Sequence, residues 1–316
     1  MGLFPKRKQN AEKIAMRIGH DGVYCASLRF EPAQKPILDF LSFYPGNGVA
    51  VQTLLERVAK ETPAKSKEVG LLLNHGEYQI LALEAMNVPD QELRSAVKWR
   101  VKEMLDFPIA EASIDVIRVP GDVANAGRNQ SLMAIVARNT VIKTHQDQAR
   151  AAKLRLNVID IPEMAQRNLS ARLETSGRGL AMLSFDAEGG LLTVTFGGEL
   201  YLSRRFDINL DQLRSTDSET QGAVFERISL ELQRSLDHFE RQHNYITNAK
   251  LVLAPLGEVG NALRTYLASN VYLSVEILDL SSILNLDQIP ELKSSEQQQK
   301  YVEIIGAALR FEGNAV

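Results

Sequence analysis

Residues 14–30 read IAMRIGHDGVYCASLRF, and this stretch decides the fold class that we expect. Ile14 to Gly19 and Val23 to Phe30 are typical of two strands, and the intervening His-Asp-Gly ends in Asp-Gly, a pair favoured in hairpin turns. Residues 37–44 predict a third strand. The sequence therefore predicts an antiparallel meander of three strands.

Helices and strands alternate after the meander. Val51, Leu54, Leu55 and Val58 recur at the spacing of one helix face, which predicts an amphipathic helix. The later elements predicted in this half are strands at 69–73 and 157–161, a helix at 139–154, and a helix that begins at Pro162. Three strands followed by alternating helices and strands imply a mixed sheet covered by helices.

The same order of elements returns after about Gly177. The predicted elements are strands at 180–185, 191–196 and 200–206, a helix at 221–242, a strand at 251–254, a helix at 259–269, a strand at 274–278 and a closing helix at 297–310. No repeat of the sequence itself accompanies this repeated order. Two such halves facing each other would form a cleft, which is a usual place for a ligand.

An additional unit interrupts the first half. A strand at 78–84, a helix at 91–106 that Pro108 stops, and strands at 114–119 and 132–137 are predicted there. We therefore expect a first half over residues 1–175 with a small subdomain inserted at about 75–137. The second half covers residues 176–316, and its last helix is a candidate to pack back on the first half.

The composition is that of a globular protein, and it excludes a disordered, collagen-like or coiled-coil protein. Of 316 residues 45% are hydrophobic, and 36 basic against 39 acidic residues give a net charge of −3, which does not favour nucleic acid binding. A single cysteine, Cys25, excludes an intramolecular disulfide and a cysteine-based zinc site.

No apolar stretch reaches the roughly 18 residues that span a bilayer, so we expect a cytoplasmic protein. The basic cluster within Met1 to Asn10 is interpreted as a solvated terminus, with contact to an anionic membrane as the alternative.

Specific stretches resemble a known family. The duplicated order of elements resembles the actin-like (ribonuclease H-like) fold of actin, sugar kinases and FtsA. Asn87-Val88-Pro89-Asp90-Gln91-Glu92-Leu93, Ala96-Val97-Lys98-Trp99-Arg100 and Leu105-Asp106-Phe107-Pro108 resemble the inserted subdomain of the PilM family of type IV pilus assembly proteins. Residues 231–239 and 305–310 resemble that family's long helix and closing helix. Within the family, the branch that serves the mannose-sensitive haemagglutinin (MSHA) pilus is the nearest that we identify.

The resemblance implies an adaptor rather than an enzyme with a substrate. It implies a cytoplasmic protein, peripheral to the inner membrane, that binds the cytoplasmic tail of a PilN-like membrane protein as an extended peptide near the inserted subdomain. It also implies contacts with the pilus motor ATPase and an oligomer or ring within the assembly. From the sequence, the regional prediction for tail binding is residues 87–108, with Trp99, Phe107 and Pro108 as candidate contacts. For Trp99, packing of the insertion onto the main body is the equal alternative.

The resemblance also locates a nucleotide cleft, whose two turns are altered here. In the family the first turn reads Asp-Ile-Gly-Ser-Ser-Ser; here Arg17-Ile18-Gly19-His20-Asp21-Gly22 replaces the acid by arginine. The second, Asp-Ile-Gly-Ala-Asn-Ser, corresponds to Ser184 through Gly189, so Ser184 replaces the acid and Asp186 a glycine. Of the family's triple glycine only Gly257 remains.

These replacements predict a degenerate site. A carboxylate about 4 Å from a phosphate oxygen costs roughly 4 kcal/mol at an effective dielectric of 20. We therefore expect no cofactor and no enzymatic activity, with an Mg-ATP-binding switch or weak ATPase as the alternative, and a filament former like FtsA as a second one. We further predict that Arg17 pairs with Asp186 across the cleft. The five histidines show no metal-ligand spacing, so no metal site is expected, and Cys25 is interpreted as a core residue.

Overall fold

The first half is built on a five-stranded mixed sheet. The structure, a computed structural model, describes residues 13–86, 88–122 and 130–310. β1 (Lys13–Gly19), β2 (Gly22–Arg29) and β3 (Ile37–Pro45) form the predicted meander, and β4 (Glu68–Leu72) and β8 (Arg155–Asp160) continue it in the order β3-β2-β1-β4-β8. β4 lies parallel to both β1 and β8. The helices of this half are α1 (Val51–Glu61), α3 (Asn139–Ala151) and α4 (Pro162–Ser170).

The second half repeats this topology. β9 (Gly179–Phe185), β10 (Gly190–Phe196), β11 (Glu199–Phe206), β12 (Asn248–Leu253) and β13 (Ser274–Ile277) form a sheet in the order β11-β10-β9-β12-β13. β9 to β11 are antiparallel, and β12 lies parallel to β9 and β13. The helices are α5 (Leu210–Leu213), α6 (Ser218–Gln242), α7 (Val259–Asn270) and α8 (Ser295–Ala308). Equal strand order and direction in both halves confirm the duplicated actin-like fold.

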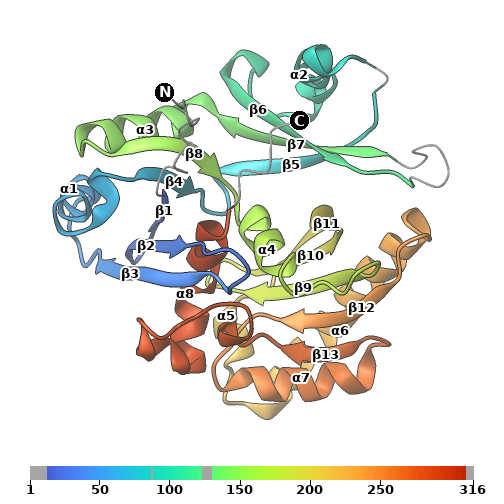
Figure 1. Ribbon diagram of the computed structural model, residues 1–316. Helices are drawn as coiled ribbons and strands as arrows, with labels where there is room; N and C mark the ends of the chain where they lie inside the picture. The colour runs from blue at the N-terminus through green and yellow to red at the C-terminus, as the bar shows by residue number, and fades with distance from the viewer. Residues whose placement is uncertain (1–12, 87, 123–129, 311–316) are drawn as a thin grey trace, which may run out of the picture.

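An inserted three-stranded sheet lies above the second half in Figure 1. β5 (Tyr78–Glu84), β6 (Ala112–Val119) and β7 (Ser131–Arg138) are antiparallel, in the order β5-β7-β6. α2 (Asp90–Val101) covers one face through Leu93, Val97 and Val101. The sequence predicted a helix over 91–106, but α2 ends at Val101. A 3-10 turn follows at Lys102–Met104, and Leu105 is extended.

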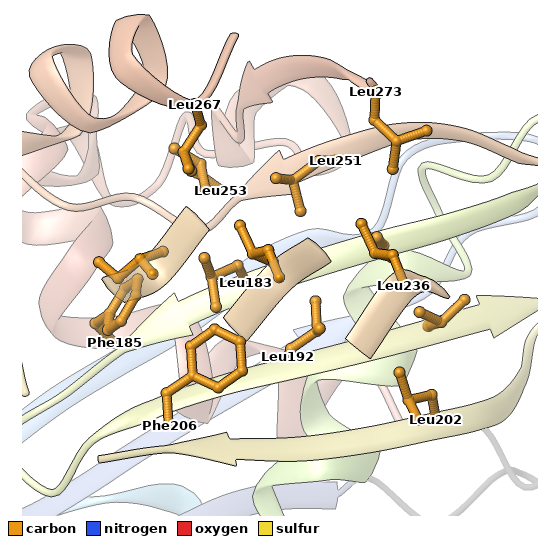
Figure 2. Close-up of a cluster of buried hydrophobic side chains, with 14 of the residues drawn as sticks. Leu183, Phe185, Leu192, Leu202, Phe206, Leu236, Leu251, Leu253, Leu267 and Leu273 are labelled. Atoms are coloured by element: carbon orange, nitrogen blue, oxygen red, sulfur yellow. The ribbon is translucent and has the colours of Figure 1, made fainter. Parts of the chain in front are cut away.

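The hydrophobic core of the second half lies between its sheet and the helices α6 and α7. Leu183, Phe185, Leu192 and Phe206 point from the sheet toward apolar residues of α6 and α7 (Figure 2). Leu183 and Leu192 are fully buried. Each such side chain contributes about 1.5–3 kcal/mol when fully buried, so this layer fixes which face of the sheet turns inward.

The last helix joins the two halves. α8 packs on α4 and also contacts β1 and β2 of the first half. At the crossing with α4, a Cβ on Gly306 would lie 2.5 Å from the Ala165 carbonyl oxygen, so only glycine permits this approach. The Asn168 side chain donates a hydrogen bond to the Gly306 carbonyl (3.0 Å). α8 therefore places its side chains in the space between the halves.

Candidate functional site

A cleft of about 390 Å³ lies between the two halves. Its walls are the β1–β2 turn, the β9–β10 turn, α4 and α8. Of the predicted cleft residues, the lining includes Arg17, His20, Asp21, Ser184, Asp186 and Gly189. The two turns that sequence analysis identified therefore face the same space.

Arg17 is the central cation of this cleft. It extends from β1 and forms an ion pair with Glu303 of α8, with Nη1 and Oε2 2.6 Å apart. Its Nε donates to Asn74 Oδ1 (3.2 Å). Burial alone would lower the pKa of Arg17, but Glu303, Asp186 and Glu188 together raise it. Arg17 is therefore a charged group held in place by α8.

The predicted pairing of Arg17 with Asp186 is wrong in its partner. Among the ion pairs of the described residues, Arg17 pairs with Glu303 and not with Asp186. The charge of Asp186 contributes to the raised pKa of Arg17, while its carboxylate accepts hydrogen bonds within the β9–β10 turn. The acid that pairs with Arg17 is therefore Glu303 of α8.

The carboxylate of Asp186 occupies the β9–β10 turn. Its Oδ1 accepts hydrogen bonds from the backbone N–H groups of Glu188 (2.8 Å) and Gly189 (2.9 Å). The Asp186 N–H in turn donates to the Gly189 carbonyl. Successive backbone N–H groups in a turn form an anion-binding concavity. Here the protein's own anion already takes two of these donors.

Ser184, at the end of β9, is part of a neutral hydrogen-bonded group. Its hydroxyl donates to Gln166 Oε1 of α4 (2.6 Å). The Gln166 amide donates to the Met182 carbonyl (2.7 Å) and contacts Thr193 Oγ1 (3.0 Å). Gln166 is buried, so this group connects α4 to the second sheet without a charge.

The β1–β2 turn carries a second carboxylate. Tyr24 donates its hydroxyl to Asp21 Oδ2 (2.5 Å), and burial followed by this bond raises the pKa of Tyr24. Asp21 Oδ1 lies 2.9 Å from the position of a Cβ on Gly19, so the carboxylate folds back over the turn. His20 is exposed beside it. Gly22 (φ +151°) requires glycine, since a Cβ would lie 2.1 Å from the Tyr44 carbonyl oxygen.

The remaining predicted cleft residue, Gly257, lies near the start of α8. Its φ is +62°, and a Cβ there would approach side chains of Gln299 and Glu296 at 3.3–3.7 Å. On α8, Lys300 places its ammonium 3.8 Å from the centre of the Phe43 ring, which is a cation–π contact. Glu296 and Gln299 of α8 line the cleft, whereas Gly257 beside them does not.

A second, more buried contact bridges the halves. The Tyr78 hydroxyl donates to Glu163 Oε2 (2.5 Å), and Arg205 Nη2 donates to Glu163 Oε1 and to the Tyr78 oxygen (both 2.9 Å). Glu163 has only 2% of its side chain exposed. Burial, which would lower the pKa of Arg205, is outweighed by Glu163, so that pKa is raised. This triad fixes β5, α4 and β11 together.

A separate groove of about 340 Å³ lies where the insertion leaves the first half. The residues that line it are Ile18, Val51, Asn74, Glu77, Thr140, Val141, Thr144, His145 and Gln148. His145 Nδ1 and Gln148 Oε1 are buried there and have no hydrogen-bond partner in the part of the chain that is described. Buried polar atoms usually have partners, so this groove has unused hydrogen-bonding capacity.

A hydrogen-bonded chain joins this groove to the cleft. His145 Nε2 contacts Glu77 Oε1 (2.8 Å), and the other oxygen of Glu77 accepts from the Asn74 N–H (2.7 Å). Asn74 Oδ1 accepts from Arg17, which pairs with Glu303. Burial would raise the pKa of Glu77, but the bonds from His145 and Asn74 lower it.

The candidate contacts in the insertion have different surroundings. The Trp99 side chain is 76% exposed on α2, so it does not pack the insertion onto the main body. It borders a hollow of about 440 Å³ together with Met86 and Arg100. Phe107 packs in the small core of the insertion under the Arg138 guanidinium, 4.0 Å from the ring centre, whereas Pro108 is exposed.

Other expectations concern metals, thiol chemistry and the membrane. Within residues 13–86, 88–122 and 130–310, no group of three or more His, Cys, Asp or Glu side chains is arranged to hold a metal ion. Cys25 is fully buried in the hydrophobic core of the first half, and this burial raises the pKa of its thiol to about 12. Within the same ranges, no helix has the length and apolarity to cross a membrane. Residues 1–10 lie outside the described ones.

Sequence reasoning did not select Glu303, Gln166 or His145. Glu303 lies in an apolar run of α8, from Tyr301 to Ile305, and a lone acid in such a run was a usable signal. Gln166 had no comparable signal, because an amide in an amphipathic helix is common. The unpartnered atom of His145 becomes apparent only in the folded structure.

Comparisons with known proteins agree with this fold. Residues 46–199, just under half of the chain, match the family model described as type IV pilus assembly protein PilM. This segment is PilM-like. A solved structure described as a PilM-PilN type IV pilus biogenesis complex is similar to the chain at 22% identity and a TM-score of 0.71. The match covers 95% of this chain and 98% of that one, and it shows the fold.

Other solved structures are less similar. A protein of Bacteroides thetaiotaomicron with an actin-like ATPase fold is 12% identical, with a TM-score of 0.49 over 92% of this chain and 99% of that one. The cytoplasmic domain of EpsL of the Vibrio cholerae type II secretion system is 11% identical, with a TM-score of 0.42 over 67% and 77%. A search of curated protein sequences finds no match.

Proposed function

We propose that this chain is a non-catalytic scaffold of a type IV pilus assembly machine. In this proposal it is cytoplasmic, binds the N-terminal cytoplasmic tail of a PilN-like inner-membrane protein, and connects that protein to the pilus motor ATPase. The PilM-like segment and the likeness to a PilM-PilN complex support the partner. The resemblance of residues 87–108 supports the narrower proposal of an MSHA-type, MshI-like member.

The observation that carries the proposal is the groove with two unpartnered buried polar atoms. An extended peptide presents backbone N–H and C=O groups at regular intervals. Because His145 Nε2 donates to the Glu77 carboxylate, Nδ1 of the neutral ring is an acceptor, so peptide N–H groups can donate to His145 Nδ1 and to Gln148 Oε1. Val51 and Val141 supply apolar wall for a side chain. We therefore place the tail in this groove, at the base of the insertion.

A binding measurement with a synthetic tail peptide tests this placement. Thr144→Trp fills the groove from an exposed position of α3, and Gln148→Ala removes one acceptor. We expect Thr144→Trp to abolish binding and Gln148→Ala to weaken it about 5- to 10-fold, because one hydrogen bond contributes about 1 kcal/mol. Gln146→Ala, on an exposed position of the same helix, is the matched control. Equal affinity of all four proteins would refute the placement.

The exposed hollow beside Trp99 is the rival position for the tail. Trp is favoured at binding hot spots, and its side chain is 76% exposed here. Trp99→Ala separates the positions, because it lies outside the groove. Loss of tail binding in Trp99→Ala with normal binding in Thr144→Trp would move the tail to α2. Deletion of residues 87–108 should abolish membrane recruitment when the tail binds beside α2, and recruitment that survives this deletion would exclude that position.

The alternative function is an ATP-binding switch, and the cleft favours the scaffold. The amides of Glu188 and Gly189 already bind the Asp186 carboxylate, and Arg17 already pairs with Glu303. A phosphate would have to displace an anion that is covalently part of the turn. These residues do not fit Mg-ATP, so we propose that the protein uses no cofactor. Sedimentation with and without nucleotide tests the further alternative of a filament or ring.

A further inference from the structure

A further hollow, separate from the cleft, from the groove beside His145 and from the hollow beside Trp99, lies between the inserted sheet and the second half. It measures about 600 Å³. β5 and β7 line it through Ile80, Ala82 and Met133 on one face of their sheet, and through Leu83 and Leu132 at the strand ends. Across from them lie four consecutive residues of β11, Tyr201 to Arg204. Successive side chains of a strand alternate between faces, so four consecutive lining residues mean that β11 borders the hollow along its length.

The strands on both sides are edge strands. β5 pairs only with β7, and β11 pairs only with β10, among the strands that the structure describes. The Tyr78–Glu163–Arg205 triad holds the start of β5 against the end of β11. From that point β5 runs toward Glu84 and β11 runs back toward Tyr201, and the hollow lies between them. An edge strand has unpaired N–H and C=O groups that can bind another extended chain.

The charge of the hollow defines the partner. Arg204 of β11 and Arg241 of α6 are exposed at its wall, and neither has a hydrogen bond or ion pair within the described part of the chain. His238 lies beside them, and Glu84 is the one carboxylate among the described lining residues. Two unpaired guanidinium groups next to an edge strand are complementary to carboxylates on an extended segment.

We propose that this hollow binds an extended acidic segment of a partner protein, which adds a strand to the free edge of β11. Alternate side chains of the segment contact the apolar face formed by Ile80, Ala82 and Met133, and the others place carboxylates near Arg204 and Arg241. The five residues from Ile80 to Glu84 correspond to about 16 Å of strand, so five to six residues of the segment fit. The site is additional to the tail groove of the proposed function.

A peptide-binding experiment with the full chain tests this site. The probes are labelled hexapeptides that alternate glutamate with valine, isoleucine, leucine, phenylalanine or tyrosine, and a matched set with lysine in place of glutamate. Fluorescence anisotropy should show binding of at least one acidic peptide, weakened by salt, and at least tenfold weaker binding of its lysine counterpart. Binding of no acidic peptide, or equal binding of both sets, would overturn the proposal.

Variants locate the binding. Arg204→Glu and Arg241→Glu should each weaken the acidic peptide at least tenfold, and Arg264→Glu on an exposed position of α7 should not. Ala82→Trp fills the hollow from an exposed position of β5 and should abolish binding, whereas Thr144→Trp in the tail groove should leave it unchanged. Circular dichroism verifies that each variant is folded. Unchanged affinity in folded Ala82→Trp or in both charge reversals would contradict this location.

Discussion

Arg17 of the first half and Glu303 of the last helix form an ion pair of 2.6 Å, and this pair bridges the two halves at the wall of the cleft. The side chains are 17% and 22% exposed, so the pair is largely shielded from water. Burial raises the pKa of Glu303 while Arg17 lowers it, and the net direction is upward. The ion pair with Arg17 therefore offsets only part of the cost of burying the Glu303 carboxylate.

Glu303→Gln should destabilise the protein. It leaves the largely shielded Arg17 without the counter-charge of Glu303, and we expect a loss of about 2 kcal/mol in the free energy of unfolding. Chemical denaturation measures this value. Glu61→Gln is the matched control, since its ion pair with Arg57 is exposed and should contribute less than about 0.5 kcal/mol. Equal effects of the two changes would mean that the Arg17–Glu303 pair does not join the halves.

Gly22→Ala should be the most damaging single-methyl change in the β1–β2 turn. The new Cβ would lie 2.1 Å from the Tyr44 carbonyl oxygen at φ +151°, so β2 and β3 would have to separate. We expect a loss of at least about 3 kcal/mol, measured by denaturation. Gly48→Ala, at φ +79° with no atom within 4 Å of its Cβ, should cost only about 1 kcal/mol. Similar losses at both sites would show that the close approach at Gly22 is relieved easily.

The buried triad should be sensitive to loss of one hydroxyl. Tyr78→Phe removes the donor to Glu163 and the acceptor for Arg205 while keeping the ring in place. We expect a loss of about 1–3 kcal/mol, because Glu163 is then buried with one partner fewer. Tyr272→Phe, which removes a hydroxyl bonded to Glu240 on the exposed surface, is the control. A stability of Tyr78→Phe equal to that of the control would contradict the bridging role.

Stability should decrease as the solution is acidified, partly through His243. Burial, with a smaller contribution from His238, lowers the pKa of His243 below its ordinary value of 6.5. The unfolded state therefore binds a proton near pH 6.5 that the folded state does not, and stability falls as the pH drops below that value. His243→Phe should reduce this loss between pH 7.5 and 5.5, whereas His75→Asn at an exposed position should not. An unchanged pH dependence in His243→Phe would show that folding does not lower the pKa of His243.

Local patterns in the sequence were sufficient for most of the fold. The Asp-Gly turn at Asp21-Gly22 and the repeated order of strands and helices predicted a mixed sheet in each half, and the structure confirms one of five strands in each. α2 was predicted too long, because its heptad-like apolar positions continue past Val101 into a 3-10 turn. The short helix α5, four residues long with an Asn209 capping box, carries too little periodicity to be predicted.

The cleft was predictable only in part. The altered residues Arg17, Ser184 and Asp186 could be identified as replacements in two turns, but their partners could not. Glu303 and Gln166 come from other helices, and the bonds from the Glu188 and Gly189 amides to Asp186 depend on the turn geometry. Such partners follow from tertiary packing, which no spacing in a single sequence reports.

The central claim is that the cleft is held by the protein's own charges and binds no nucleotide. Thermal unfolding with Mg-ATP, Mg-ADP and metal-free ATP, followed by calorimetry, tests it most directly. A ligand at about 100 times its dissociation constant would add roughly 2.7 kcal/mol of stability. We predict no shift under any condition. A magnesium-dependent shift that Ser184→Trp at the cleft wall abolishes would contradict the account and establish the nucleotide switch instead.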